Sequence, residues 1–416
     1  MPIYSHLDYL QKHAVATPQI LEAPHPQLRL VVVTTYLDDA MLKTFVAEMG
    51  RLREPQGPVE VICISNQGDF QEIQTFLGEK NRELGQGEAP RSMRFYTIQA
   101  PAESELQGGG GMLLKIGMDE AIHRFELAGQ PDGIILVVDA GKVCPPDLLE
   151  KVEQEFQQRP KVQTIGIKTL YEQSPNDPVL SVGKLFVDLS ERMFVTGLKF
   201  CGHPYAFPMM EIAFAVRASA YQAQAGMSKR KLRPTFDFLQ KFVELGTHHH
   251  CLTTQVQSRW ISTNNPDFEI GNAIWKYSIK PNDRYPVFHA ESYIALKNGL
   301  KGCPSWFSLS ESQLQSAVSG FPKGFREFME AEGFVAKVLE MKRYTTNAEA
   351  FAKRFFRWFN SLKTLQYFHY CRDHFWPDQP IEDVGNELVA WMENDPSIYM
   401  EFYELSVYFE KKARLK

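Results

Sequence analysis

The amino-acid sequence predicts an α/β fold: a doubly wound, mostly parallel sheet followed by a mostly helical C-terminal region. Between about residues 28 and 168, short apolar segments rich in β-branched residues alternate with segments of helical periodicity. This alternation is typical of parallel strands covered by helices. From about residue 311 onward the pattern becomes helical and aromatic. We therefore expect an N-terminal arm over residues 1–26, a sheet domain over 27–275 and a helical region over 276–416.

The individual elements follow from local composition. Continuous apolar runs are typical of strands buried on both faces of a sheet. Strands are expected, in chain order, over 28–35, 59–65, 94–98, 133–138, 162–168 and 211–216. Helices are expected over about 38–52, 70–84, 112–128, 148–158, 182–196 and 236–245. The four glycines at 108–111 are expected to form a loop, and Gly246 is the usual residue past a helix end.

Polar side chains follow three of the predicted strands. Asp38 comes after the first strand, Asn66 after the second, and Asp139 ends the fully apolar run that begins at Gly133. Ligands of open α/β sheets bind at the carboxyl ends of the strands, so we expect these three side chains around a nucleoside diphosphate. Each also has a structural alternative: Asp38 as a helix cap, Asn66 as a turn residue and Asp139 as a cap of its own turn.

Composition excludes several classes of partner and location. The formal net charge of −5 gives no field that would favour nucleic acid. The six cysteines contain no Cys-x-x-Cys pair, and the first residues lack the pattern of a signal peptide, so a reduced, cytoplasmic setting is expected. The longest apolar runs are too short to span a bilayer. The aromatic, basic segment 351–376 leaves peripheral membrane contact open, although packing inside the protein is the favoured alternative.

Several segments resemble, in the right order over roughly residues 28–275, the family-two glycosyltransferases, which have the GT-A fold. The segment 111–121 resembles the helix after the family's glycine-rich loop, and Asp139-Ala140-Gly141 resembles its Asp-x-Asp strand. The segment 213–221 resembles its acceptor-side strand, and 236–241 the helix that follows the catalytic Glu-Asp. Two positions depart from the family pattern: Gly141 replaces the second metal-binding carboxylate, and Pro234-Thr235 stands where Glu-Asp is expected.

The resemblance implies a GT-A-like enzyme that transfers a sugar from a nucleotide-diphosphate sugar to an unknown acceptor. Asp139 would hold a divalent metal, manganese or magnesium, with weak or absent dependence because of Gly141. Asp237 is the expected general base, since it is the carboxylate nearest the vacant Glu-Asp position. Lys115 is expected either to reach the diphosphate or to lie solvated on its helix.

Alternatives to this function stay open. The first is a non-catalytic glycosyltransferase descendant that binds a nucleotide sugar or a partner protein. A nucleotidyltransferase is disfavoured because residues 34–39 contain neither glycine nor a basic residue. His203 is a weaker candidate for contact with a sugar hydroxyl. The run His248-His249-His250 is not expected to bind one metal ion, since consecutive residues of an extended segment point to opposite faces.

Overall fold

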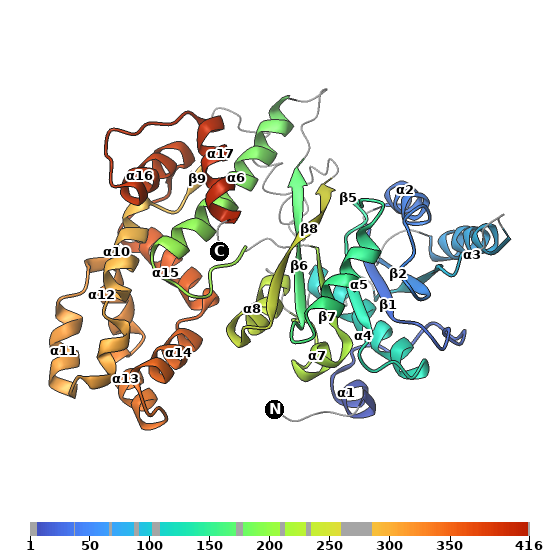
Figure 1. Ribbon diagram of the computed structural model, residues 1–416, viewed down its shortest axis with the longest axis horizontal. Coiled ribbons are helices and arrows are strands. Elements are labelled where there is room, and N and C mark those ends of the chain that lie inside the picture. Colours follow the sequence, from blue (N-terminus) through green and yellow to red (C-terminus); the bar gives the residue numbers. More distant parts are fainter. Residues whose placement is uncertain are drawn as a thin grey trace. The chain divides into compact units, whose positions relative to one another are not determined.

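The computed structural model (Figure 1) describes residues 6–36, 38–65, 69–86, 91–101, 109–171, 178–208, 213–229, 234–258 and 285–414, and every structural statement below concerns these residues. The chain forms two compact units. The sheet unit comprises Met1–Asn176 and Met209–Asn272, and the helical unit comprises Asp177–Pro208 and Ala273–Lys416. Residues 1–26, expected as a separate arm, thus group with the sheet, whereas residues 177–208, expected in the sheet domain, group with the C-terminal helices.

In the described part of the sheet unit, eight strands form one mixed, mostly parallel sheet in the order β3-β2-β1-β4-β7-β6-β8-β5. The strands are β1 (Leu30–Thr35), β2 (Val59–Ser65), β3 (Arg94–Gln99), β4 (Ile134–Val137), β5 (Lys142–Val143), β6 (Thr164–Tyr171), β7 (Phe214–Arg217) and β8 (His248–Ser258). The pairs β1–β2, β2–β3, β1–β4 and β6–β8 are parallel, and β7 lies antiparallel between β4 and β6. The predicted α/β class and its mostly parallel sheet are confirmed.

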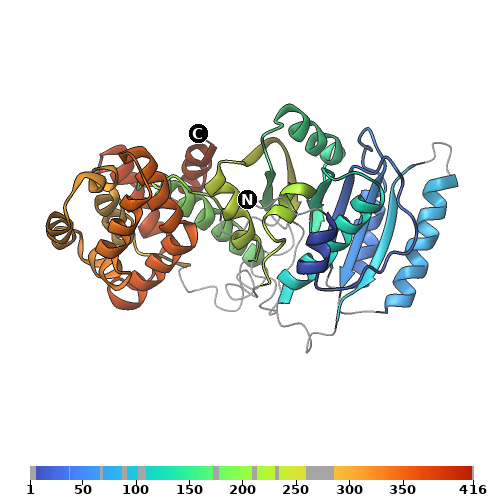
Figure 2. The ribbon, with the colours of Figure 1, turned by 90° about the horizontal axis from the view of Figure 1, so that it is seen from below.

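Helices cover both faces of this sheet (Figures 1 and 2). On one face α2 (Asp39–Met49), α3 (Phe70–Gln86) and α5 (Leu148–Gln158) share an apolar core with alternate residues of β1, β2 and β4. On the other face α4 (Gly109–Leu127) packs on β1 and β2 and meets α8 (Pro234–Leu245), which follows the short α7 (Ala218–Ala223). The close approach of α4 to β1 needs a small residue: a Cβ at Gly117 would lie 2.6 Å from Val33 Cγ1.

The glycine run does not form the expected loop over its whole length. Gly109, Gly110 and Gly111 form the first turn of α4, so the helix begins three residues before the predicted start at Met112. Helical periodicity in the apolar residues downstream outweighs the weak helix propensity of three glycines. Gly246 has φ of +69°, which is the left-handed conformation expected at the end of α8.

The N-terminal residues are anchored to α4 by side chains. Tyr9, on α1 (His6–His13), donates a hydrogen bond to Asp119 Oδ1 at 2.7 Å. Further along, the Glu120 carboxylate accepts hydrogen bonds from the backbone N–H groups of Gln19, at 2.9 Å, and Ile20, at 3.2 Å. Buried polar contacts of this kind integrate residues 9–20 into the sheet unit.

The helical unit has its own aromatic core. Its helices are α6 (Pro178–Phe200), α10 (Ala290–Leu300), the 3-10 helix Cys303–Ser308, α11 (Glu311–Ser319), α12 (Lys323–Ala331), α13 (Phe334–Arg343), α14 (Ala348–Trp358), α15 (Ser361–His374), α16 (Ile381–Glu393) and α17 (Phe402–Arg414), with the short pair β9 (Pro286–Val287) and β10 (Gln379–Pro380). Phe351, Phe355 and Phe359 are fully buried, and Phe355 packs edge-on against Trp306. The fully buried phenylalanines of this segment therefore pack inside the unit, as the favoured alternative expected.

Among the described helices, none combines the length and the apolar character that a membrane crossing requires.

Candidate functional site

Three parallel strands end side by side at one edge of the sheet. Thr35 pairs with Ile64, so β1 and β2 end together, and β4 is in parallel register with β1. Beyond β4, the N–H of Ala140 still donates to Thr35 O at 3.0 Å, which places the Asp139 turn directly beside the end of β1. The predicted convergence of the strand ends at Thr35, Ser65 and Asp139 is confirmed. Nucleotide binding at this edge stays a prediction.

Asp38 caps the helix that follows β1. Its side chain accepts a hydrogen bond from the Met41 N–H at 2.8 Å, and its backbone is extended, as at most N-caps. The carboxylate is exposed at the same edge of the sheet. Asp38 therefore has the helix-capping role that was the structural alternative. Its contact with a nucleoside stays a prediction. Asn66 lies outside the described residues.

Asp139 closes its own turn. Its Oδ1 accepts a hydrogen bond from the Gly141 N–H at 2.7 Å, and its main-chain oxygen accepts from the Lys142 N–H at 3.0 Å. The side chain is half-buried, which leaves it partly open to solvent at the carboxyl edge. One carboxylate oxygen is therefore committed to the turn before any ligand arrives.

Lys142, three residues after Asp139, is a site residue that we did not predict from the sequence. It begins β5, which pairs antiparallel with the end of β8, and its exposed fraction is 2%. Its Nζ donates a hydrogen bond to Ser258 Oγ at 3.1 Å. Burial lowers the pKa of Lys142, and the negative charge of Asp139 opposes that shift. The signal in the sequence is a lysine directly after Asp-Ala-Gly, but its burial depends on β8, more than 100 residues later.

These residues do not fit a divalent cation. Magnesium prefers several oxygen ligands, and the turn offers one carboxylate that is partly used, a glycine, and then an ammonium group. Throughout the ranges that the structure describes, no group of three or more His, Cys, Asp or Glu side chains is arranged to hold a metal ion. The turn at Asp139 therefore does not support the metal-binding role that its resemblance to Asp-x-Asp implies.

Lys115 lies on α4 in a buried polar cluster. Its Nζ is 3.1 Å from Asp119 Oδ2 and 3.1 Å from the hydroxyl of Tyr9. Tyr221, on α7, donates to the same Asp119 at 2.8 Å. Burial lowers the pKa of Lys115, and Asp119 opposes the shift. The expectation of a solvated helix lysine is wrong, because the side chain is 1% exposed and its charge is paired. Contact with a diphosphate stays a prediction.

Asp237 lies in the first turn of α8 and is 8% exposed. Ser228 Oγ donates to its Oδ2 at 3.5 Å. One turn later, Lys241 Nζ donates to Gln224 O at 3.1 Å, and its pKa is lowered by burial and raised by Asp237. Since α8 ends just before β8 begins and packs on it, its first turn points toward the carboxyl edge. The inward placement expected for Asp237 is thus observed, and its role as a base is untested.

The histidines take structural positions. His203 is 3% exposed inside the helical unit, where its Nε2 lies 2.9 Å from Phe359 O and 3.0 Å from Thr364 Oγ1. A buried ring with these partners does not reach a sugar, so that weaker candidate is wrong. His248 and His249 lie on opposite faces of β8, where His248 contacts Thr164 Oγ1 at 2.9 Å and His249 contacts Glu155 at 3.7 Å.

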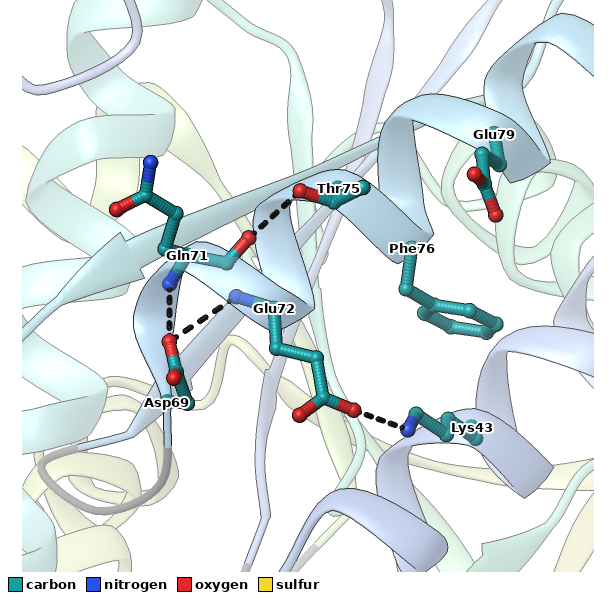
Figure 3. A pocket seen from close by; sticks show the side chains of 7 residues that line it. All are labelled: Lys43, Asp69, Gln71, Glu72, Thr75, Phe76 and Glu79. Atoms are coloured by element: carbon teal, nitrogen blue, oxygen red, sulfur yellow. Dashed lines mark hydrogen bonds and ion pairs between the residues drawn. The ribbon is translucent and has the colours of Figure 1, made fainter.

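Hollows are present on the described part of the sheet unit. One, of about 620 Å³, lies between α2 and α3 and is lined by Lys43, Asp69, Gln71, Glu72, Thr75, Phe76 and Glu79 (Figure 3). Figure 3 shows Asp69 accepting the N–H groups of Gln71 and Glu72 while Lys43 pairs with Glu72 at 2.8 Å, so its charges are largely satisfied internally. A second hollow, of about 400 Å³, lies at the edge of the sheet opposite to the Asp139 turn, where β4 begins and β7 ends.

Comparison with known proteins gives distant structural likenesses. No protein-family model matches the sequence, and no curated protein matches it. Among solved structures, S. aureus TarS 1-349 is similar at 12% identity and a TM-score of 0.39, over 80% of this chain and 92% of that chain. The complex of TarS 1-349 with UDP gives 12% identity and a TM-score of 0.40, and the complex with UDP-GlcNAc gives 13% and 0.39, with the same coverage. These likenesses are too distant to assign a fold family or an activity to this chain.

Proposed function

We propose that this protein binds a nucleotide-diphosphate sugar at the carboxyl edge of β1, β2 and β4 and transfers the sugar to an acceptor, as a divergent GT-A glycosyltransferase. The observation that carries the proposal is the common end of these three parallel strands, each followed by polar groups. Open α/β sheets bind ligands at this edge. The half-buried Asp139 and the exposed Asp38 would lie around the nucleoside, with Asn66 as a further candidate.

Asp237 is the proposed general base. A base must sit close to the acceptor hydroxyl and remain ionised near neutral pH. The buried position of Asp237 at the start of α8 supplies a carboxylate, and Lys241 lies one turn further along the same helix. Pro234 and Thr235, which precede it, carry no carboxylate. The proposed transfer is inverting if Asp237 deprotonates the attacking hydroxyl.

A non-catalytic binding protein is the second candidate. It is favoured by the turn at Asp139, where one carboxylate oxygen is already committed to the Gly141 N–H and the described residues do not fit a divalent cation. Loss of leaving-group stabilisation and loss of the Glu-Asp pair remove separate interactions with the transition state of transfer, so their effects on the rate would compound.

A panel of nucleotide sugars in a thermal-shift assay, with and without manganese, tests the binding step. Stabilisation by at least one of them, competed by its nucleoside diphosphate, is the expected result. Absence of any stabilisation across uridine, guanosine, adenosine, cytidine and thymidine diphosphate sugars would refute the proposal.

Transfer and donor hydrolysis then separate the two candidates. We expect Asp237→Asn to lower any transfer rate by about 10²–10⁴-fold with donor affinity unchanged, the usual contribution of a general base. Asp132→Asn, a carboxylate change at the opposite edge of the sheet, is the matched control and should keep the rate. Binding without transfer or hydrolysis in the wild type would favour the non-catalytic candidate.

A further inference from the structure

The amine of Lys142 is buried with few partners. The side chain is 2% exposed, and Ser258 Oγ is the one hydrogen-bond acceptor that it has among the described residues. An ammonium group carries three N–H donors, so two of them have no acceptor in that part of the chain. Buried polar groups normally have their hydrogen-bond partners, and a buried charge without them is costly. An anionic ligand would supply the missing acceptors.

The charge of Lys142 is also not cancelled by direct contact. Asp139 is close enough to act on it electrostatically, yet the described residues place no carboxylate within ion-pair distance of its Nζ. Lys142 opens β5 opposite Ser258, immediately after the turn that Asp139 closes beside the end of β1. The amine of Lys142 thus lies beside the Asp139 turn, next to the edge at which the three strands end.

A divalent cation does not fit the same turn. Glycine at position 141 offers no side-chain ligand, Asp139 Oδ1 is held by the Gly141 N–H, and an ammonium group repels a metal ion from the space beside it. A diphosphate leaving group nevertheless needs its developing charge to be met by a cation. Lysine is a common phosphate ligand, acting as a compact point charge.

We propose that Lys142 supplies the positive charge for the diphosphate of the bound nucleotide, in place of a divalent metal ion; this rests on the function proposed above. Two phosphate oxygens would accept the N–H donors that Ser258 leaves free, and Asp139 would keep its role at the turn. Binding of the nucleoside diphosphate then needs no added metal.

Titration calorimetry with the best-binding nucleoside diphosphate and with its parent nucleoside tests this proposal. We expect the wild-type affinity to be the same in EDTA and in manganese. Lys142→Met keeps the length and apolar stem of the side chain. Its affinity for the nucleoside diphosphate should fall by about 10- to 100-fold, as for loss of a charged hydrogen bond, and its affinity for the nucleoside should barely change. Lys142→Arg keeps the charge and should keep part of the affinity.

Ser258→Ala is the matched control, because it removes the hydroxyl partner and leaves the ammonium in place. It should bind the diphosphate within about threefold of wild type, because the ammonium keeps its charge and a phosphate oxygen accepts the N–H that the serine hydroxyl no longer accepts. Thermal unfolding of each variant shows whether it is folded. If Lys142→Met does not fold, loss of wild-type affinity in EDTA can still overturn the proposal, and the affinity of Lys142→Arg still tests the residue.

The outcomes separate this proposal from the function on which it rests. Loss of wild-type affinity in EDTA, restored by manganese, overturns the role of Lys142 and leaves nucleotide binding standing. Unchanged affinity of folded Lys142→Met overturns it in the same way. Failure of the wild type to bind any nucleoside diphosphate, with or without metal, overturns both.

Discussion

Among single residues of the sheet unit, Arg124 on α4 forms a buried ion pair with Glu60 on β2. Arg124 is fully buried, and its Nε and Nη2 donate to the two oxygens of Glu60 at 2.8 and 2.7 Å. A third donor, Nη1, reaches the carbonyl of Glu22, and the guanidinium lies over the ring of Tyr96. The pair therefore ties α4, two strands and the N-terminal segment together.

Removing one partner of this pair should be costly. Arg124→Met leaves the Glu60 carboxylate buried and unpaired, so the free energy of unfolding should fall by about 3–5 kcal/mol. Urea unfolding followed by circular dichroism measures the loss. In the double variant Arg124→Met/Glu60→Leu much of the stability should return, because no buried charge remains. Equal stability of the single variant and wild type would contradict the structure.

The exposed pair of Lys353 and Glu349 is the control for Arg124. These side chains meet at 2.8 Å on the surface of α14, and both are largely exposed. Lys353→Met should leave the urea midpoint unchanged, since water screens such a pair and holding it costs side-chain entropy.

His203 makes the helical unit sensitive to acid. Burial lowers the pKa of His203 from 6.5 to about 4, and the hydrogen bond to Phe359 O opposes part of this shift. Between those two pH values the unfolded chain binds a proton that the folded chain does not, so stability falls as the pH drops through this window.

We expect wild type to lose about 3 kcal/mol more than His203→Gln between pH 7 and pH 4, since each tenfold loss of proton affinity on folding corresponds to about 1.36 kcal/mol. Urea titrations of both proteins at several pH values give this difference, in which the contributions of other titrating groups cancel. Parallel pH profiles for the two proteins would show that His203 is not buried as a neutral ring.

The partners of buried charged side chains could not be predicted from the sequence. Hydrophobic periodicity marks which side of a helix is buried, but it does not say which charged residue finds a partner there. Lys115, Arg124 and Lys142 all have sequence contexts that suit solvated lysine or arginine. Glu60 and Ser258, the partners of Arg124 and Lys142, come from other elements, as does the Tyr9 hydroxyl beside Lys115, so only the assembled fold brings these groups together. The placement of Asp139 was predictable because it ends a continuous apolar strand.

At the scale of elements, two glycines inside helices should respond in opposite ways to alanine. Gly78 on α3 has no atom within 4 Å of an added Cβ, whereas at Gly117 on α4 it would lie 2.6 Å from Val33 Cγ1. Gly78→Ala should raise the free energy of unfolding by about 0.5–1 kcal/mol through helix propensity alone. Gly117→Ala should lower it by about 1–3 kcal/mol, because the overlap with β1 outweighs that gain.

Urea unfolding of the two alanine variants, made in the same background, checks this pair, and each serves as the control for the other. Stabilisation by both would mean that α4 does not approach β1 as closely as described. Destabilisation by both would mean that other atoms of the protein pack against α3 at Gly78, where the structure has open space.

Most elements were predictable because each has a strong local signal. The all-apolar strands β1, β2 and β4 and the amphipathic α5 lie where the sequence places them. The start of α4 was missed, since three glycines in a first helical turn go against local propensity. The grouping of α6 was missed for another reason: its helical pattern is clear, but nothing local says which core it joins.

At the scale of the whole molecule, two separate cores should give two unfolding transitions. The sheet unit is built around the apolar strands, and the helical unit around aromatic residues such as Phe355 and Trp306. In scanning calorimetry, Arg124→Met should lower the midpoint of one transition. Phe355→Ala, at a cost of about 3–5 kcal/mol for a fully buried ring, should lower the other. If calorimetry shows a single transition, and its midpoint falls in Arg124→Met and also in Phe355→Ala, the two units unfold together.

The placement of α6 has a consequence for synthesis on the ribosome. The chain leaves the sheet unit after β6, forms α6, and returns to complete the sheet with β7 and β8. The helices that α6 packs against, α10, α16 and α17, are translated later, and α17 comes roughly 200 residues after it. At about 5–20 residues per second, α6 emerges about 10–40 s before its last partner exists. During that time α6 lacks the helices that cover its apolar residues in the folded protein, so we expect chaperones to bind this segment while the chain is being made.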